Sequence, residues 1–303
     1  MHSSSELKMD RRTAEASCVE TETGWLDSVT GDILMQVMTE LASMMSLLGR
    51  TSAGKRIMKI QARARTLLHE VACLITAREI NPWIRLRLSP EESPVPVSAH
   101  PSRVGVFPLS ANPIHWGHLL TGLSLMARAK LDKIVYVIAN ESPSVELYPE
   151  ELRRRAAEEA ISLFQPLFTL VPASAGKAIG GPASLFRLLG LNNQHVMELF
   201  YVSAYEAGAS TSLMEIMDAL WGGSKTHASG RENQRPVSLI RVDAGRPDSP
   251  VSQNQRILAI PQPLPWISTA AVRAALLSPL HRDELSAVPA CAFRQLRMLS
   301  SFD

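Results

Sequence analysis

The chain has 303 residues, of which 46% are hydrophobic and 20% are charged. This composition is typical of a globular protein and is too apolar for a disordered one. The 31 basic and 29 acidic residues leave a formal net charge of +2, so neither a nucleic-acid partner nor an acidic tail is expected.

The amino-terminal residues 1–24 hold no apolar stretch of the kind found in a secretory signal. The longest apolar runs of the chain are also shorter than the roughly 18 residues that a membrane span needs. The three cysteines are widely spaced, which indicates no disulfide framework and favours a reducing compartment. We therefore expect a cytoplasmic protein without a membrane segment, whose residues 1–24 are disordered.

Two long helical patterns follow this segment. Apolar residues recur every three or four positions at 25–49 and again at 55–79, where the spacing is that of a short coiled-coil seam. Gly49 is a stop signal between the two patterns. We predict that residues 25–80 form a helical hairpin, and that this hairpin is an oligomerisation or docking element through which a homo-oligomer would form.

A proline-rich segment at 81–102 cannot carry a regular helix and is interpreted as a linker or as a strap across another surface. From 103 to 303, short and continuously apolar runs alternate with helical patterns, which indicates buried parallel strands joined by helices. The prediction is an α/β domain at 103–303 with a doubly wound, parallel, Rossmann-like sheet of five to six strands. The predicted strands are 104–107, 133–139, 168–171, 199–204, 237–242 and 256–260. The predicted helices are 116–131, 149–164, 182–190, 211–223 and 268–277.

The first predicted strand leads into the most informative stretch, RVGVFPLSANPIHWGHLL at 103–120. Ligands of such folds bind at the carboxyl ends of the strands, and the free N–H groups at a helix start favour an anion. His115 and His118 share one face of the first helical turn, and Gly117 leaves room for a close approach. The combination favours a phosphate site. No third ligand follows at metal spacing, so no metal held by side chains is expected.

This stretch resembles, without a gap, the signature of the nucleotidylyltransferase superfamily, which is a strand, a turn and His-x-Gly-His. Within it the chain is most similar to the nicotinate/nicotinamide mononucleotide adenylyltransferases, whose second motif is matched by ISTAAVR at 267–273. The resemblance covers residues 103–280. The chain departs from the family at Pro108 and Leu109, where the family has Gly-Gly, and at Ala270, where it has threonine.

The resemblance implies transfer of the adenylyl group of ATP to a small phosphorylated acceptor, foremost nicotinate or nicotinamide mononucleotide, with release of pyrophosphate. This is a step of NAD biosynthesis. It implies that His115, His118 and Arg273 are catalytic, through contacts with the phosphates, and that Mg²⁺ enters with ATP. The residues that the resemblance assigns to nucleotide binding are Phe107, Ser110, Asn112, Gly117, Ser268 and Thr269.

Two alternatives stay open at this point. One is a related transferase that uses CTP or another phosphate acceptor, and the other is a non-catalytic nucleotide-binding scaffold protein. The region after the second predicted strand lacks the lysine often found in adenylyltransferases. The basic run Arg153 to Arg155 either replaces that lysine or forms a solvated helix face, and we favour the solvated face.

Overall fold

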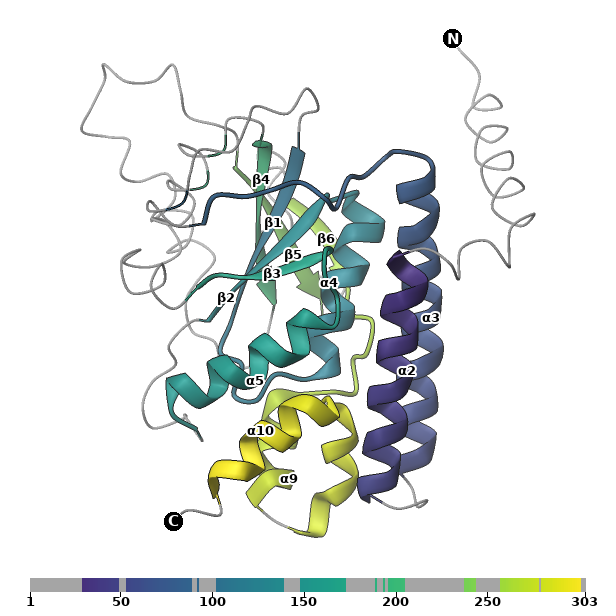
Figure 1. Ribbon diagram of the computed structural model, residues 1–303, viewed down its shortest axis with the longest axis vertical. Coiled ribbons are helices and arrows are strands. Elements are labelled where there is room, and N and C mark those ends of the chain that lie inside the picture. The colour runs from purple at the N-terminus through teal and green to yellow at the C-terminus, as the bar shows by residue number, and fades with distance from the viewer. Residues whose placement is uncertain are drawn as a thin grey trace.

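The computed structural model describes residues 29–48, 53–88, 92, 102–138, 148–172, 189, 193, 196–204, 237–243, 257–277 and 279–300. A central sheet lies between helices, with two long helices along one side and a group of carboxyl-terminal helices below it (Figure 1). The predicted helix at 211–223 and the predicted disordered segment at 1–24 lie outside the described residues, as does the predicted helix at 182–190 apart from residue 189.

The sheet has the strand order β3-β2-β1-β4-β5-β6, and every neighbouring pair is parallel. The predicted α/β class with a parallel sheet is therefore confirmed. β1 is central, with β2 on one side and β4 on the other, so the order of the strands reverses beside β1. The strands are β1 (Ser102–Leu109), β2 (Lys133–Ile138), β3 (Phe168–Leu170), β4 (Val196–Ala204), β5 (Val237–Asp243) and β6 (Ile257–Pro261).

Helices follow the first two strands and also form the first and last elements of the part of the chain that the structure describes. In β1 the apolar run continues to Leu109, two residues beyond the predicted strand. The helices are α2 (Val29–Leu48), α3 (Ala53–Thr76), α4 (Trp116–Ala129), α5 (Glu150–Ser162), α9 (Thr269–Leu277), the 3₁₀ helix η3 (Pro279–Ala287) and α10 (Ala290–Ser300). The sequence reading did not include η3 and α10.

β1 is buried on both faces of the sheet. Phe107 and Leu109 belong to the larger hydrophobic core, together with residues of α4 and α5. Val104 and Val106 belong to a smaller cluster on the other face, because successive side chains of a strand point to opposite sides. The continuous apolar run of β1 is explained by this double burial.

The amino-terminal helices α2 and α3 lie side by side along the molecule (Figure 1). Their buried residues, such as Leu41 and Leu67, are part of the same core as those of α4. α3 lies directly against α4. The two helices therefore share one core with the sheet region instead of burying their apolar faces only against each other.

The start of the proline-rich segment is held against the sheet. The ammonium group of Lys133, at the start of β2, donates to the carbonyl oxygen of Ile84 at 2.8 Å. The side chain of Asn193 accepts from the N–H of Arg87 at 2.6 Å and donates to its carbonyl oxygen at 3.1 Å. Residues 81–88 thus form a strap, which was one of the two interpretations of this segment.

Two further expectations are addressed by the structure. No helix among the described residues is long and apolar enough to cross a membrane. Cys73 is disulfide-bonded, whereas Cys291 is free and buried. The wide spacing of the three cysteines gave no sign of this bond.

Candidate functional site

The turn between β1 and α4 has an unusual backbone. Ala111 has a φ of 50°, a left-handed conformation that is uncommon for residues with a β-carbon and that clusters at functional sites. The following Asn112 is fully buried and precedes Pro113 through a cis peptide bond. His115 then takes the N-cap position of α4. The turn therefore places His115 at the carboxyl edge of the sheet, beside the reversal in strand order.

The two histidine rings lie on top of each other. The ring centroids of His115 and His118 are 3.7 Å apart and their planes differ by 12°. Both side chains are buried, at 2% and 7% exposure. The backbone N–H of His115 donates to Nδ1 of His118 at 3.3 Å. Because Nδ1 of His118 accepts this hydrogen bond, the neutral ring carries its proton on Nε2, which is then a hydrogen-bond donor.

Gly117 is required by this stacking. A β-carbon at Gly117 would lie 2.9 Å from ring atoms of His115 and 3.4 Å from a methyl carbon of Ile267. The first distance is shorter than real contacts of this kind, so a side chain would displace the His115 ring. The distance to Ile267 shows that the start of the motif at 267–273, hereafter the distal motif, lies against the start of α4.

The distal motif meets the histidines directly. Nε2 of His115 lies 3.0 Å from Oγ1 of Thr269, a buried hydrogen bond between residues 154 positions apart in the sequence. Oγ of Ser268 accepts a hydrogen bond from the N–H of Ala271 at 3.2 Å, which caps the amino terminus of α9. Two helix starts, those of α4 and α9, thus face a common region, and helix starts favour anions.

Arg273 lies one turn after Thr269 on α9. Residues four positions apart share one side of a helix, so Arg273 is on the side of α9 that carries the contact with His115. Its side chain is partly buried. The structure therefore brings together Thr269, His115 and His118 by direct contacts, whereas Arg273 is located only as the residue one helical turn after Thr269 on α9.

An aromatic layer supports the histidines from the sheet. The hydroxyl of Tyr136, in β2, donates to the carbonyl oxygen of His118 at 3.2 Å. Phe107 stacks on Tyr136 at a centroid distance of 5.3 Å and meets His118 edge to face at 6.4 Å. Burial raises the pKa of Tyr136 well above its usual value, so this hydroxyl stays a donor at neutral pH. Phe107 is therefore a support beneath His118.

Arg153 supports the turn that leads into the site, a role that the sequence did not indicate. Its guanidinium is fully buried, and it donates to the carbonyl oxygen of Ser110 at 2.5 Å and to that of Tyr148 at 3.1 Å. Arg154 is also buried and donates to the carbonyl oxygen of Val171 at 2.8 Å. The interpretation of this run as a solvated face is wrong for both residues, because they hold loops at the strand ends.

Arg155 fits the solvated interpretation, since it is exposed and pairs with Glu151 one turn earlier. A run of three arginines on a helix gives no sign of which of them turn inward. The one available signal was position, because the run begins a helix that follows a strand end, where ligands of such folds bind.

The groups gathered at the two helix starts are chiefly hydrogen-bond donors. Among the residues that the structure describes, no three His, Cys, Asp or Glu side chains gather in a way that would hold a metal ion. The groups shown at the two helix starts are imidazoles, hydroxyls and helix N–H groups. Such a set suits a phosphate anion, since each member donates hydrogen bonds or carries positive charge.

Comparison with known proteins identifies no family. No protein-family model matches the chain. The chain is similar to the G-protein coupled receptor moody of Drosophila pseudoobscura pseudoobscura, with 28% identity over 171 residues. The match covers 56% of this chain but only 22% of the receptor. A similarity this partial does not show that the chain belongs to the receptor's family, and it says nothing of the histidine site.

Proposed function

We propose that the chain is a nucleotidyltransferase that transfers the adenylyl group of ATP to a small phosphorylated acceptor and releases pyrophosphate. The preferred acceptor is nicotinate or nicotinamide mononucleotide, as the sequence resemblance implies. The proposal includes a nucleotidyltransferase-like domain at 103–303, with a doubly wound, Rossmann-like sheet of five to six strands preceded by a helical hairpin.

The observation that carries the proposal is the hydrogen bond between His115 and Thr269 at 3.0 Å. The two motifs of the resemblance lie far apart in the sequence, and each alone is a weak signal. Their direct contact at the carboxyl edge of a parallel sheet is what a shared triphosphate site requires.

The proposed reaction needs no general base. A phosphate oxygen of the acceptor, already ionised at neutral pH, attacks the α-phosphorus of ATP. The bond from that phosphorus to the bridging oxygen breaks, and pyrophosphate leaves with the electron pair. The protein holds both anions in line and stabilises the growing charge. His115 and His118 would donate to the phosphates, while Ser268, Thr269 and Arg273 would bind the leaving pyrophosphate.

Mg²⁺ enters this proposal only as the companion of ATP. The described residues of the site offer donors and few carboxylates, so the ion would be held chiefly by phosphate oxygens. Bound there, it would supply positive charge to the triphosphate. The orientation of the nucleotide would rest on the histidines and on the two helix starts.

The direct test is an assay of pyrophosphate release. The purified chain is incubated with ATP or CTP, and with each mononucleotide or another phosphate acceptor in turn. Turnover with ATP and a nicotinate or nicotinamide mononucleotide supports the proposal, and turnover with CTP alone refutes adenylyl transfer. His118→Ala should remove most of the activity, because losing one such donor typically costs about 3–4 kcal/mol of transition-state stabilisation.

A non-catalytic nucleotide-binding scaffold is the second candidate. It is favoured by the engagement of His115, whose ring stacks on His118 and whose Nε2 contacts Thr269. It is also favoured by Pro108 and Leu109, which replace two glycines of the family and bring side chains to the end of β1. Trace turnover that His118→Ala leaves unchanged, together with tight ATP binding, would identify this second function.

The proposal extends to assembly and location. Met35, Met45 and Met58 are exposed on the amino-terminal helices, which supports a homo-oligomer through the hairpin. Light scattering on the chain and on a variant in which these three exposed methionines are replaced by glutamate tests this assignment. A reaction that consumes ATP favours the cytoplasm.

A further inference from the structure

Helix α3 reaches the residue that leads into the distal motif. The guanidinium carbon of Arg56 lies 5.3 Å from the ring centroid of Trp266, a distance typical of cation–π contacts. The same guanidinium forms an ion pair with Glu284 of η3. Trp266 immediately precedes Ile267 and the start of α9. Arg56 of α3 therefore contacts one residue that precedes α9 in the sequence and one that follows it.

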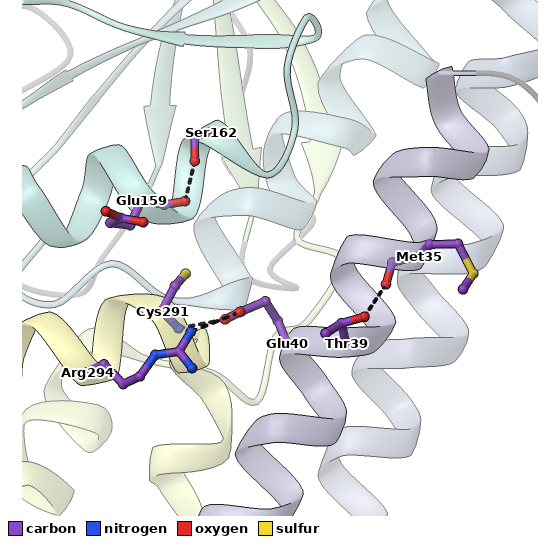
Figure 2. Close-up of polar contacts among 7 residues, drawn as sticks. All are labelled: Met35, Thr39, Glu40, Glu159, Ser162, Cys291 and Arg294. Atoms are coloured by element: carbon purple, nitrogen blue, oxygen red, sulfur yellow. Dashed lines mark hydrogen bonds and ion pairs between the residues drawn. The ribbon is translucent and has the colours of Figure 1, made fainter.

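Helix α2 contacts α10, the helix that follows η3, through a buried glutamate. Glu40 is buried, at 8% exposure, and its carboxylate accepts the backbone N–H of Cys291 at 2.6 Å and a guanidinium N–H of Arg294 at 3.4 Å (Figure 2). Cys291 lies in the first turn of α10, whose N–H groups have no partner within the helix. An acidic group also interacts favourably with a helix start. Glu40 therefore caps α10 from another helix.

The amino-terminal helices also pack near the histidines, through α3. α3 lies against α4, the helix that begins with the two histidines, and their buried residues share one core. The helices α2 and α3 thus contact the element that carries His118 and the elements that flank Thr269. The amino-terminal helices therefore contact elements of both motif regions from outside the sheet.

We propose that α2 and α3 are a brace that positions α9 against the histidine pair, and that Arg56 is the positioning residue of this brace. As an assignment of catalytic geometry, this inference rests on the proposed function. The planar guanidinium is suited to the role, because it stacks on Trp266 while pairing with the carboxylate of Glu284. A lysine would keep the charge but lose the planar stacking.

The test compares three variants of the full chain: Arg56→Ala, Arg56→Lys and the control Arg65→Ala. Arg65 is an exposed arginine of the same helix, so the control removes the same charge from α3 without touching Trp266. Hydrogen exchange of the backbone N–H groups is measured in α9 and, for comparison, in α2. We expect Arg56→Ala to speed exchange in α9 at least ten-fold, Arg56→Lys to restore part of the protection, and Arg65→Ala to stay within two-fold of the unmodified chain.

Steady-state kinetics with ATP then connects the brace to catalysis. Arg56→Ala should lower kcat/KM for ATP about ten-fold, because small misplacements of a binding group are costly in such sites, and Arg56→Lys should recover part of it. Unchanged exchange in α9, or equal acceleration in α9 and α2, overturns the brace. If the unmodified chain neither binds nor turns over ATP, the proposed function fails, while the exchange result still decides whether Arg56 positions α9.

Discussion

The guanidinium of Arg153 donates a hydrogen bond to the carbonyl oxygen of Ser110 across 2.5 Å. The helix after β2 therefore holds the turn after β1, the turn in which Ala111 has a positive φ. A second bond, to the carbonyl oxygen of Tyr148, holds the start of the same helix. The buried arginine thus fixes the backbone that leads into His115.

Replacing Arg153 by methionine should strongly destabilise the chain. Methionine fills much of the same space but leaves the carbonyl groups of Ser110 and Tyr148 without this buried donor. We expect a loss of about 2–4 kcal/mol in the free energy of unfolding, measured by urea denaturation. The matched control is Arg155→Met, which removes an exposed pair with Glu151 and should cost about 0.5 kcal/mol or less. Similar losses in the two variants would contradict the role assigned to Arg153.

Gly122 should not tolerate a methyl group. A β-carbon there would lie 2.2 Å from the hydroxyl oxygen of Tyr136 and 2.8 Å from a ring carbon of Phe168. Gly122→Ala should therefore cost about 1–3 kcal/mol in the free energy of unfolding, through overpacking between α4 and the sheet. The control is Gly54→Ala in α3, where nothing lies within 4 Å and where alanine should stabilise the helix by up to about 1 kcal/mol.

Combining Gly122→Ala with Tyr136→Phe distinguishes overpacking from a loss of helix geometry. Tyr136→Phe removes the oxygen that the new methyl group would meet, so the double variant should be more stable than the sum of the two single losses predicts. Strict additivity of the two losses would show that the hydroxyl does not set how closely α4 lies on β2.

Periodic elements were predictable from local physics, whereas individual buried charges were not. The β1 run and the helix beginning at Trp116 follow from continuous apolarity and from the turn before His115. The contact of Thr269 with His115 joins residues 154 positions apart, and no local pattern predicts such a pairing. Only the resemblance brought the two motifs together before the structure did.

The inward arginines and Glu40 show why the remainder was missed. A charged residue within a helical pattern is normally solvated, because burying a charge without partners is costly. Arg153 and Glu40 are buried because backbone groups of other elements are their partners. Such partners are known only once the elements have been assembled in the fold. The packing that supports the site therefore cannot be predicted from local sequence patterns.

The contribution of Lys133 to the stability of the folded chain should rise with pH in the alkaline range. Burial lowers the pKa of Lys133 from 10.5 to about 8, so the charged form disfavours the folded state. This cost is fully present below pH 8, on the order of 3 kcal/mol at about 1.4 kcal/mol per pKa unit. It is relieved between pH 8 and 10.5, where the unfolded chain binds more protons than the folded one.

Comparison with Lys133→Met isolates this contribution. Other groups that titrate in the same range are shared by the two proteins and cancel in the difference. Between pH 7.5 and 9.5, the unmodified chain should gain on the order of 1–2 kcal/mol relative to the variant, as measured by urea denaturation at each pH. A constant difference across this range would mean that the lysine keeps its ordinary pKa in the folded protein.

Thr269→Val should separate the contact with His115 from the packing of α9. Valine has nearly the same shape as threonine but lacks the hydroxyl that lies 3.0 Å from Nε2 of His115. We expect kcat/KM for ATP to fall by the equivalent of about 1–3 kcal/mol, because a buried imidazole loses its partner. Thr269→Ser keeps a hydroxyl at this position and should retain most of the activity. If valine is as active as threonine while serine is not, the methyl group of Thr269 matters instead of its hydroxyl, and the distal motif acts on the site through packing alone.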